Sequence, residues 1–221
     1  MVDSIDIKYM PEKTLRVFQQ LKSQAFISNF TLVGGTALAI QIKHRQSEDL
    51  DFVFDGEDLN INLIKRNIHK LFPNHRIIRQ DHNLQIDVLV NEVKVTFFST
   101  GAVAIPFRVR EYSFAEDKLN IARAKAIATL KFSAIAQRNT IRDYYDLYCL
   151  SRYHFPLLEL ITFTKKLLPN LSPITYSETL VYVKDIDEQD ISSHLSPVEI
   201  VTKNQMAAYF IQELRKIKEN L

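Results

Sequence analysis

The chain has 221 residues and a mass of 25.7 kDa, which is enough for one large domain or two small ones around a real hydrophobic core. Hydrophobic residues make up 46% and charged residues 24% of the sequence, a globular composition that excludes a mainly disordered chain. The 28 Lys and Arg and 26 Asp and Glu leave a formal net charge of +2, which excludes a uniformly basic coat for nucleic acid.

Hydrophobic periodicity in the first half predicts helices that alternate with short strands. A short apolar run ends at the adjacent Gly34 and Gly35, and because the chain has only four glycines, this pair indicates a backbone requirement. The predicted elements are a helix at 11–26, a strand at 30–33, a helix at 36–42, a strand at 50–54, a helix at 57–72 and strands at 77–79, 84–90 and 93–98, the last two joined as a hairpin by Asn91 and Glu92.

The second half is predicted to be helical from about residue 117 onward. Its predicted helices are 117–137, 141–153, 157–168 and 197–219, and the polar stretch 177–190 is expected to be a surface loop or a short strand. The predicted fold class is α+β. A small mixed β-sheet flanked by helices forms a first domain over residues 1–115, and a helical domain follows over residues 116–221.

Residue usage excludes several kinds of site. Cys149 is the only cysteine, so neither an intramolecular disulfide nor a cysteine zinc cluster can form, and a buried structural thiol is expected. The six histidines show no HxxxH or HxH spacing, so a histidine metal site is not expected. The N-terminal segment lacks the pattern of a secretory signal, and no apolar run approaches the roughly 18 residues that cross a bilayer. We therefore expect a cytoplasmic protein without a membrane partner.

The strongest chemical signal is the acidic strand predicted at 50–54. Asp49 and Asp51 are two positions apart, so their carboxylates face the same side of a strand, while Leu50 and Phe52 face the core. Two neighbouring carboxylates repel each other unless a cation lies beside them, and such a pair on a rigid strand suits Mg²⁺. The alternative is a solvated edge strand whose charges prevent aggregation.

The glycine pair and the acidic pair lie close together in the sequence. Gly34 and Gly35 would let the backbone approach a phosphate, and the start of the following helix favours an anion. A triphosphate would find a backbone site and a metal site within one small segment. The alternative for the glycines is a tight turn between strand and helix.

Two separated blocks resemble a known family. GGTALAI at 34–40 with HRQSEDLDF at 44–52 resembles the nucleotidyltransferase motif of AbiEii-type toxins, within the DNA polymerase beta-like superfamily. KFSAIAQR at 131–138 with RDYYDLY at 142–148 resembles the second signature of that family, and LVNEVKVTFF at 89–98 lies between the blocks in the right order.

The resemblance implies metal-dependent transfer of a nucleoside monophosphate from an NTP to an acceptor, often RNA in toxin members. By the same resemblance, Gly34, Gly35 and Thr36 would hold the triphosphate. Asp49 and Asp51 would bind Mg²⁺ and serve catalysis.

The resemblance also implies functional residues in the helical half. Lys131 would contact the nucleotide phosphates, and Asp143 or Asp146 would order the site or assist the acceptor. Arg138, Arg142 and Asp146 are expected among the nucleotide-binding residues. From spacing alone, the alternative is a helix surface with ion pairs.

Local charge favours the functional interpretation of both halves. Residues 118–153 contain seven Lys and Arg and two Asp, whereas residues 46–60 contain six Asp and Glu and no Lys or Arg. A basic helical half with an acidic strand suits Mg²⁺ and polyphosphate together.

The sequence departs from the superfamily pattern at two places. Thr36 stands one position after the usual Gly-Ser pair and is expected to replace its serine hydroxyl. The third carboxylate, which normally acts as base or second metal ligand, is not evident: Thr96 stands where an acidic residue is expected, and Asp87 is the available substitute. If neither serves, the expectation is that only one metal ion binds tightly or that a bound substrate completes the site.

We therefore predict a Mg²⁺-dependent nucleotidyltransferase that modifies RNA, with the tRNA acceptor end as a candidate, as the toxin partner of an antitoxin. Two alternatives remain open. The acceptor is a small molecule or a protein, or the chain is a catalytically silent NTP-binding module.

Overall fold

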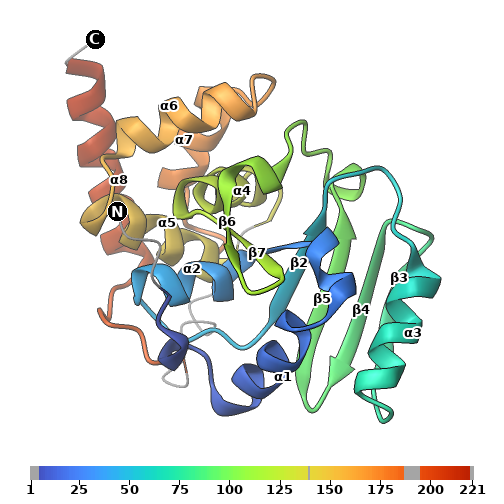
Figure 1. Cartoon of the computed structure of the whole chain (residues 1–221). Coiled ribbons are helices and arrows are strands. Elements are labelled where there is room, and N and C mark those ends of the chain that lie inside the picture. Colours follow the sequence, from blue (N-terminus) through green and yellow to red (C-terminus); the bar gives the residue numbers. More distant parts are fainter. Residues whose placement is uncertain (1–4, 139, 187–194, 220–221) are drawn as a thin grey trace. The chain divides into compact units, whose positions relative to one another are not determined.

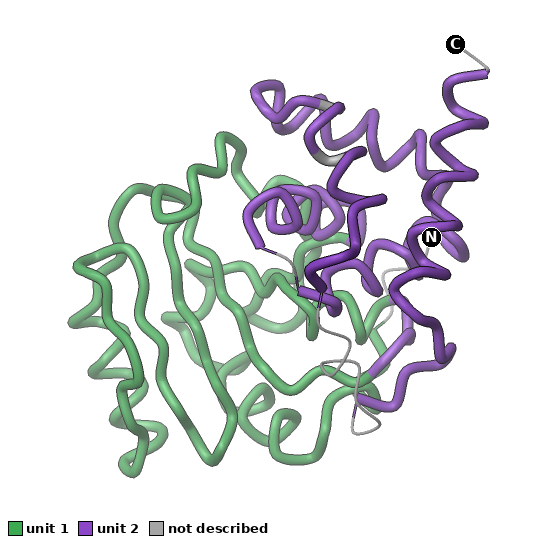
Figure 2. The backbone as a smooth tube through the Cα atoms, turned by 180° about the vertical axis from the view of Figure 1, so that it is seen from behind, with its two compact units in different colours: residues 1–41, 46–123 green, residues 42–45, 124–221 purple. Residues whose placement is uncertain are grey.

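The computed structural model describes residues 5–138, 140–186 and 195–219 and divides into two compact units (Figure 2). The sheet unit comprises Met1–Gln41 and Gln46–Arg123, and the helical unit comprises Ile42–Arg45 and Ala124–Leu221. The division falls after Arg123, whereas the predicted domain boundary followed residue 115, and the short segment 42–45 belongs to the helical unit.

The sheet unit is built on one mixed sheet with the strand order β3-β4-β5-β2-β1-β7-β6 (Figure 1). Strand β1 is parallel to β7 and β2 is parallel to β5, while the other neighbours are antiparallel. The strands are β1 Thr31–Val33, β2 Leu50–Phe54, β3 Arg76–Asp81, β4 Gln85–Val90, β5 Val93–Ser99, β6 Ser113–Glu116 and β7 Leu119–Ala122. The mixed sheet with its helices confirms the predicted α+β class.

Amphipathic helices supply the apolar cover of this sheet. Helix α1 buries Val17 and Phe18, and α3 buries Ile64 and Ile68, because apolar residues recur there at helical spacing. The Asn60 side chain begins α3 by accepting a hydrogen bond from the Leu63 N–H. The helical segments of the sheet unit are η1 Ile7–Tyr9, α1 Glu12–Lys22, η2 Ala25–Asn29, α2 Gly34–Ile42, α3 Ile61–Leu71, η3 Gly101–Val103 and η4 Val109–Tyr112.

The central strands lie where the sequence predicts them. Strand β2 has the predicted bounds, and β4 and β5 form the predicted hairpin. Its two turn residues, Asn91 and Glu92, have φ angles of 48° and 64°, as the favoured two-residue hairpin turns require.

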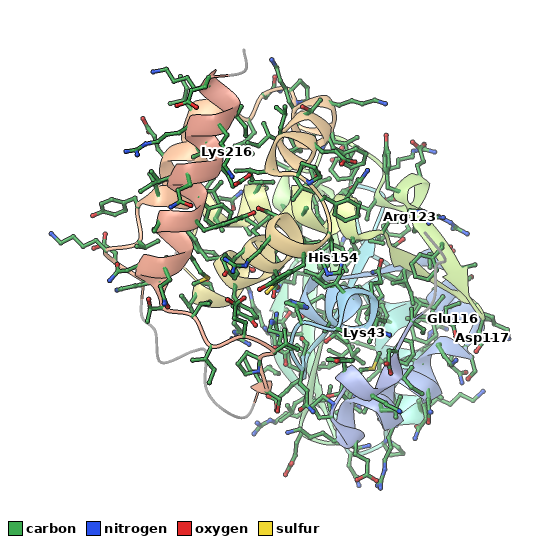
Figure 3. All side chains as sticks on the ribbon, turned by 90° about the vertical axis from the view of Figure 1, so that its left-hand side faces the viewer. Lys43, Glu116, Asp117, Arg123, His154 and Lys216 are labelled. Atoms are coloured by element: carbon green, nitrogen blue, oxygen red, sulfur yellow. The ribbon has the colours of Figure 1, made fainter. Side chains whose placement is uncertain are left out.

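The single helix predicted at 117–137 is wrong in its first part. Strands β6 and β7 form a hairpin at the sheet edge instead, and α4 begins only at Ala124. Leu119 and Ile121 are fully buried and β7 pairs with β1, so non-local pairing overrides local helix preference. Glu116 and Asp117 project from this hairpin (Figure 3), and both form ion pairs with Lys22 at the end of α1.

The helical unit surrounds α5. Tyr144, Tyr145 and Tyr148 of this helix are buried, in keeping with a packing role. Burial also raises the pKa of Cys149 to about 12, so its thiol is protonated at neutral pH. The helices are α4 Ala124–Ile135, α5 Ile141–Tyr153, α6 Leu157–Leu167, α7 Pro173–Val181 and α8 Lys203–Glu219.

The stretch 177–190 differs from its prediction as a loop or strand. Its first residues complete α7, and residues 187–190 lie outside the described part of the chain. Among the described residues, no helix is both long and apolar enough to span a membrane.

Candidate active site

The predicted acidic pair lies at the start of β2. Leu50 and Phe52 are fully buried on the apolar face of the sheet, so Asp51 faces the opposite side. Across the sheet, Asp51 is paired in register with Thr96 of β5, and Thr96 is paired with Asp87 of β4. Residues directly opposite one another share a face. Asp51, Thr96 and Asp87 therefore form one row on the same face, which we call the carboxylate face.

Gly34 lies against the Asp51 carboxylate. Its φ of +73° is in the left-handed region, and a Cβ atom placed on it would lie 2.4 Å from Asp51 Oδ2. Only glycine fits here without strain or displacement of the carboxylate. The start of α2 and the Asp51 side chain are thereby held in direct contact.

Thr36 and Thr14 fix the chain just before β2. The buried Thr36 hydroxyl donates a hydrogen bond to the Asp49 carbonyl oxygen, and Thr14 Oγ1 donates to the Glu48 carbonyl at 2.8 Å. The Thr36 hydroxyl is thus engaged with the backbone, where the resemblance implied a triphosphate contact. This engagement positions Asp49.

The third position of the row is occupied by Thr96 and Asp87. Thr96 is 6% exposed, and its Oγ1 has no hydrogen-bond partner among the described residues. Asp87 is also buried. It accepts a hydrogen bond of 2.8 Å from Gln85, and its Oδ2 lies 3.6 Å from Lys94 Nζ. Within the described ranges, no three His, Cys, Asp or Glu side chains are close enough to hold a metal ion together.

In the helical unit, the second motif forms a buried ion cluster. Lys131 Nζ lies 2.5 Å from Asp143 Oδ1 and 2.7 Å from Asp146 Oδ2. Arg45 binds the fully buried Asp146 with two donors, Nε to Oδ1 at 2.7 Å and Nη2 to Oδ2 at 2.9 Å. His44 Nε2 lies 2.7 Å from Asp146 Oδ1. We call these five residues the buried ion cluster.

Opposite charges dominate the titration of this cluster. Burial disfavours the charged forms, but Asp143 and Asp146 outweigh it and raise the pKa of Lys131. Against the same burial, Arg45 and Lys131 hold the pKa of Asp146 well below its ordinary value. His44 behaves differently, because burial lowers its pKa despite the pull of Asp146. The imidazole is therefore neutral at pH 7 and donates from Nε2 to Asp146.

The model of the AbiEii nucleotidyltransferase toxins, which belong to type IV toxin–antitoxin systems, matches residues 16–171. The chain belongs to this family. It is 31% identical over 208 residues to an uncharacterized protein of Aquifex aeolicus (strain VF5), covering 92% of this chain and 98% of that protein.

Two solved structures share the fold of this AbiEii-family chain. MenT4, a nucleotidyltransferase toxin from Mycobacterium tuberculosis H37Rv, matches with a TM-score of 0.57 and 13% identity over 93% of this chain and 86% of its own. A candidate nucleotidyltransferase from H. pylori matches with a TM-score of 0.54 and 19% identity over 96% and 97% of the two chains. Family membership makes the protein a nucleotidyltransferase enzyme.

The other predicted residues of this AbiEii-family enzyme lie at the margin of the buried ion cluster. Arg138 Nε lies 2.9 Å from Asp143 Oδ2, but its side chain is 64% exposed. Arg142 is half-buried and has no ion pair with a described residue.

Sequence reasoning missed His44 and Arg45 as parts of the cluster. Both lie inside the HRQSEDLDF block that carries the resemblance. A basic pair a few residues before an acidic segment was the available signal. Its partner Asp146 lies about 100 positions away along the chain, so spacing could not reveal it.

Proposed function

We propose that the protein transfers a nucleoside monophosphate from an NTP to a hydroxyl group of an RNA, with Mg²⁺ held by Asp49 and Asp51. The contact between Gly34 and Asp51 carries this proposal. It puts the start of α2, whose N–H groups suit a phosphate, against a carboxylate that suits the cation.

The residues of the carboxylate face fit such a cation. Mg²⁺ in proteins is usually bound by one or two carboxylates and by substrate phosphates, so Asp49 and Asp51 suffice as protein carboxylates. Thr96 adds a buried hydroxyl without a partner among the described residues, on the face of Asp51. When bound, the ion would neutralise charge on the phosphates.

In the proposed reaction the acceptor hydroxyl oxygen forms a bond to the α-phosphorus of the NTP. The bond from that phosphorus to the oxygen that bridges to the β-phosphate breaks, and pyrophosphate leaves. Gly34 and Gly35 bind the phosphates through the backbone, and Thr36 positions Asp49. Asp87, in the same row as Asp51, is the proposed acceptor of the hydroxyl proton.

In the helical unit we assign positioning roles to Lys131, Asp143 and Asp146, because Lys131 forms ion pairs with both carboxylates. Arg138 and Arg142 are the candidates there for contact with nucleotide phosphates. The family assignment further supports an antitoxin partner and action in the cytoplasm.

The test uses NTPs labelled at the α-phosphate, Mg²⁺ and total RNA. We expect transfer of label to RNA by the wild type, and at least about a 100-fold loss for Asp51→Asn. Asp58→Asn, which removes an exposed carboxylate just after β2, is the matched control and should retain activity. Label on RNA from none of the four NTPs, or equal labelling by Asp51→Asn, would overturn the proposal. Label on a small molecule or a protein would reassign the acceptor.

A further inference from the structure

The carboxylate face of the sheet extends beyond Asp87 to the edge strand β3. Arg79 of β3 is paired in register with Asp87, so the row continues as Arg79, Asp87, Thr96 and Asp51 across four strands. The neighbouring row joins Arg76 to Leu89 and Leu89 to Lys94. Arg76, Arg79 and Lys94 therefore lie on the same face as Asp51, and we call them the cationic track.

A β-bulge brings both arginines to this face. In a regular strand, residues three positions apart point to opposite faces. The register of β3 shifts between Ile77 and Arg79, so Ile78 is an extra residue, and Arg76 and Arg79 face the same way. Without the bulge, one of the two arginines would project from the opposite face of the sheet.

The three cations are accessible and only weakly paired. Arg76 is exposed and forms no ion pair with a described residue. Arg79 is 58% exposed and lies 3.5 Å from Asp81, and Lys94 is 45% exposed and lies 3.6 Å from Asp87. The exposed Arg79–Asp81 pair contributes at most about 1 kcal/mol, and Lys94 Nζ lies too far from the buried Asp87 carboxylate for a hydrogen bond, so an anionic ligand can compete for these cations.

The sheet order separates this track from the proposed nucleotide position. Gly34 follows β1, which borders β2 on one side, while β5, β4 and β3 lie on the other side of β2. Three strand spacings place β3 about 14 Å from β2. A triphosphate at the start of α2 lies on the far side of Asp51, so it does not account for the track. In-line displacement requires the attacking group to approach opposite the leaving group.

We propose that the cationic track binds the backbone phosphates of a single-stranded segment of the nucleic-acid acceptor and guides its hydroxyl towards Asp51. This inference rests on the proposed function. The track is bordered by polar Gln85 and Thr96 and by the half-buried ring of Phe98, which is paired in register with Gln85. A nucleic acid is favoured over an acidic protein because an aromatic ring beside cations suits the stacking of a base next to its phosphates.

The test measures binding of the full-length protein to a fluorescent single-stranded RNA by anisotropy, without NTP, over a series of salt concentrations. For Arg76→Ala/Arg79→Ala we expect about 25-fold weaker binding in 0.1 M salt and a slope of log K against log salt that is shallower by about 1.4. Arg66→Ala/Lys70→Ala removes two exposed cations of α3, which supplies the apolar cover, and serves as the matched control with wild-type binding.

Each outcome decides for or against the track. Wild-type binding and slope in Arg76→Ala/Arg79→Ala would overturn it, even if label transfer to RNA is intact. Weaker binding by this variant supports the track even if no label transfer to RNA is found, so the two failures are distinguishable. Absence of RNA binding by the wild type would overturn the inference. Equally tight binding of poly-glutamate, lost in the same variant, would overturn it in favour of an acidic protein partner.

Discussion

At the residue scale, Gly34 is the position with the least freedom to change. Replacing it by alanine adds a Cβ atom 2.4 Å from Asp51 Oδ2 and forces a non-glycine residue to a φ of +73°. Such backbone strain costs about 1–3 kcal/mol. We predict that Gly34→Ala lowers the free energy of unfolding by this amount, measured by urea titration, and abolishes nucleotidyl transfer because Asp51 must move.

The Gly34→Ala/Asp51→Ala double variant separates the two contributions. Removing the carboxylate relieves the steric overlap but leaves the backbone strain, so the two stability losses are expected to be less than additive. Strict additivity of the two losses would contradict a direct clash.

His44 makes stability depend on pH. Burial lowers its pKa in the folded state below the ordinary value of about 6.5, so below that pH the unfolded chain binds a proton that the folded chain does not. Stability is therefore fully present above about pH 6.5 and falls as the pH decreases, by up to about 1.4 kcal/mol per pH unit. Urea titrations at pH 7.5, 6.5 and 5.5 measure this slope. His44→Gln keeps a donor to Asp146 and should flatten it, and equal slopes in both proteins would exclude His44 as the cause.

At the scale of elements, Asp146 joins α4, α5 and the segment 42–45. Its carboxylate is fully buried between Arg45, His44 and Lys131. We predict that Asp146→Ala destabilises the protein by about 3–5 kcal/mol, because the buried Arg45 loses its two-donor contact with a carboxylate and the buried Lys131 keeps only Asp143. Arg138→Ala removes a largely exposed arginine that pairs with Asp143, and should cost less than about 1 kcal/mol. Similar unfolding midpoints for the two variants would refute the structural role of the cluster.

The elements that were predicted correctly owe their form to local pattern. Acidic and apolar residues alternate from Asp49 to Phe52, so the period of strand β2 is readable at its start. Strands β6 and β7 have four residues each and depend on pairing with each other and with β1, far away along the chain. Local propensity cannot predict such a pairing, because it depends on a strand that is distant in the sequence.

The same distinction applies to the site. The pairing of Asp49 and Asp51 on one face stays a prediction from their spacing, and in the structure Asp51 lies in β2 while Asp49 directly precedes it. Thr96 and Asp87 share this face because of the register between β4, β5 and β2. The sequence alone does not determine that register. The resemblance identified Lys131, Asp143 and Asp146 as a group, but their mutual ion pairs required the structure.

At the scale of the whole molecule, the helical unit is not a continuous stretch of chain. At the end of α2, Lys43 (labelled in Figure 3) adopts a φ of 60°, and residues 42–45 join the helical unit before the chain returns to β2 (Figure 2). A fragment of residues 124–221 lacks His44 and Arg45, so Asp146 would retain only Lys131. We predict that this fragment shows no cooperative urea unfolding by circular dichroism. Unfolding with the midpoint of the full chain would contradict the prediction.

This interleaved path also limits how the molecule can be recombined. A chimaera with a relative that exchanges everything after residue 123 would combine an Asp146 from one parent with an Arg45 from the other. Such an exchange would succeed only when residues 42–45 are inherited together with the helices that they contact.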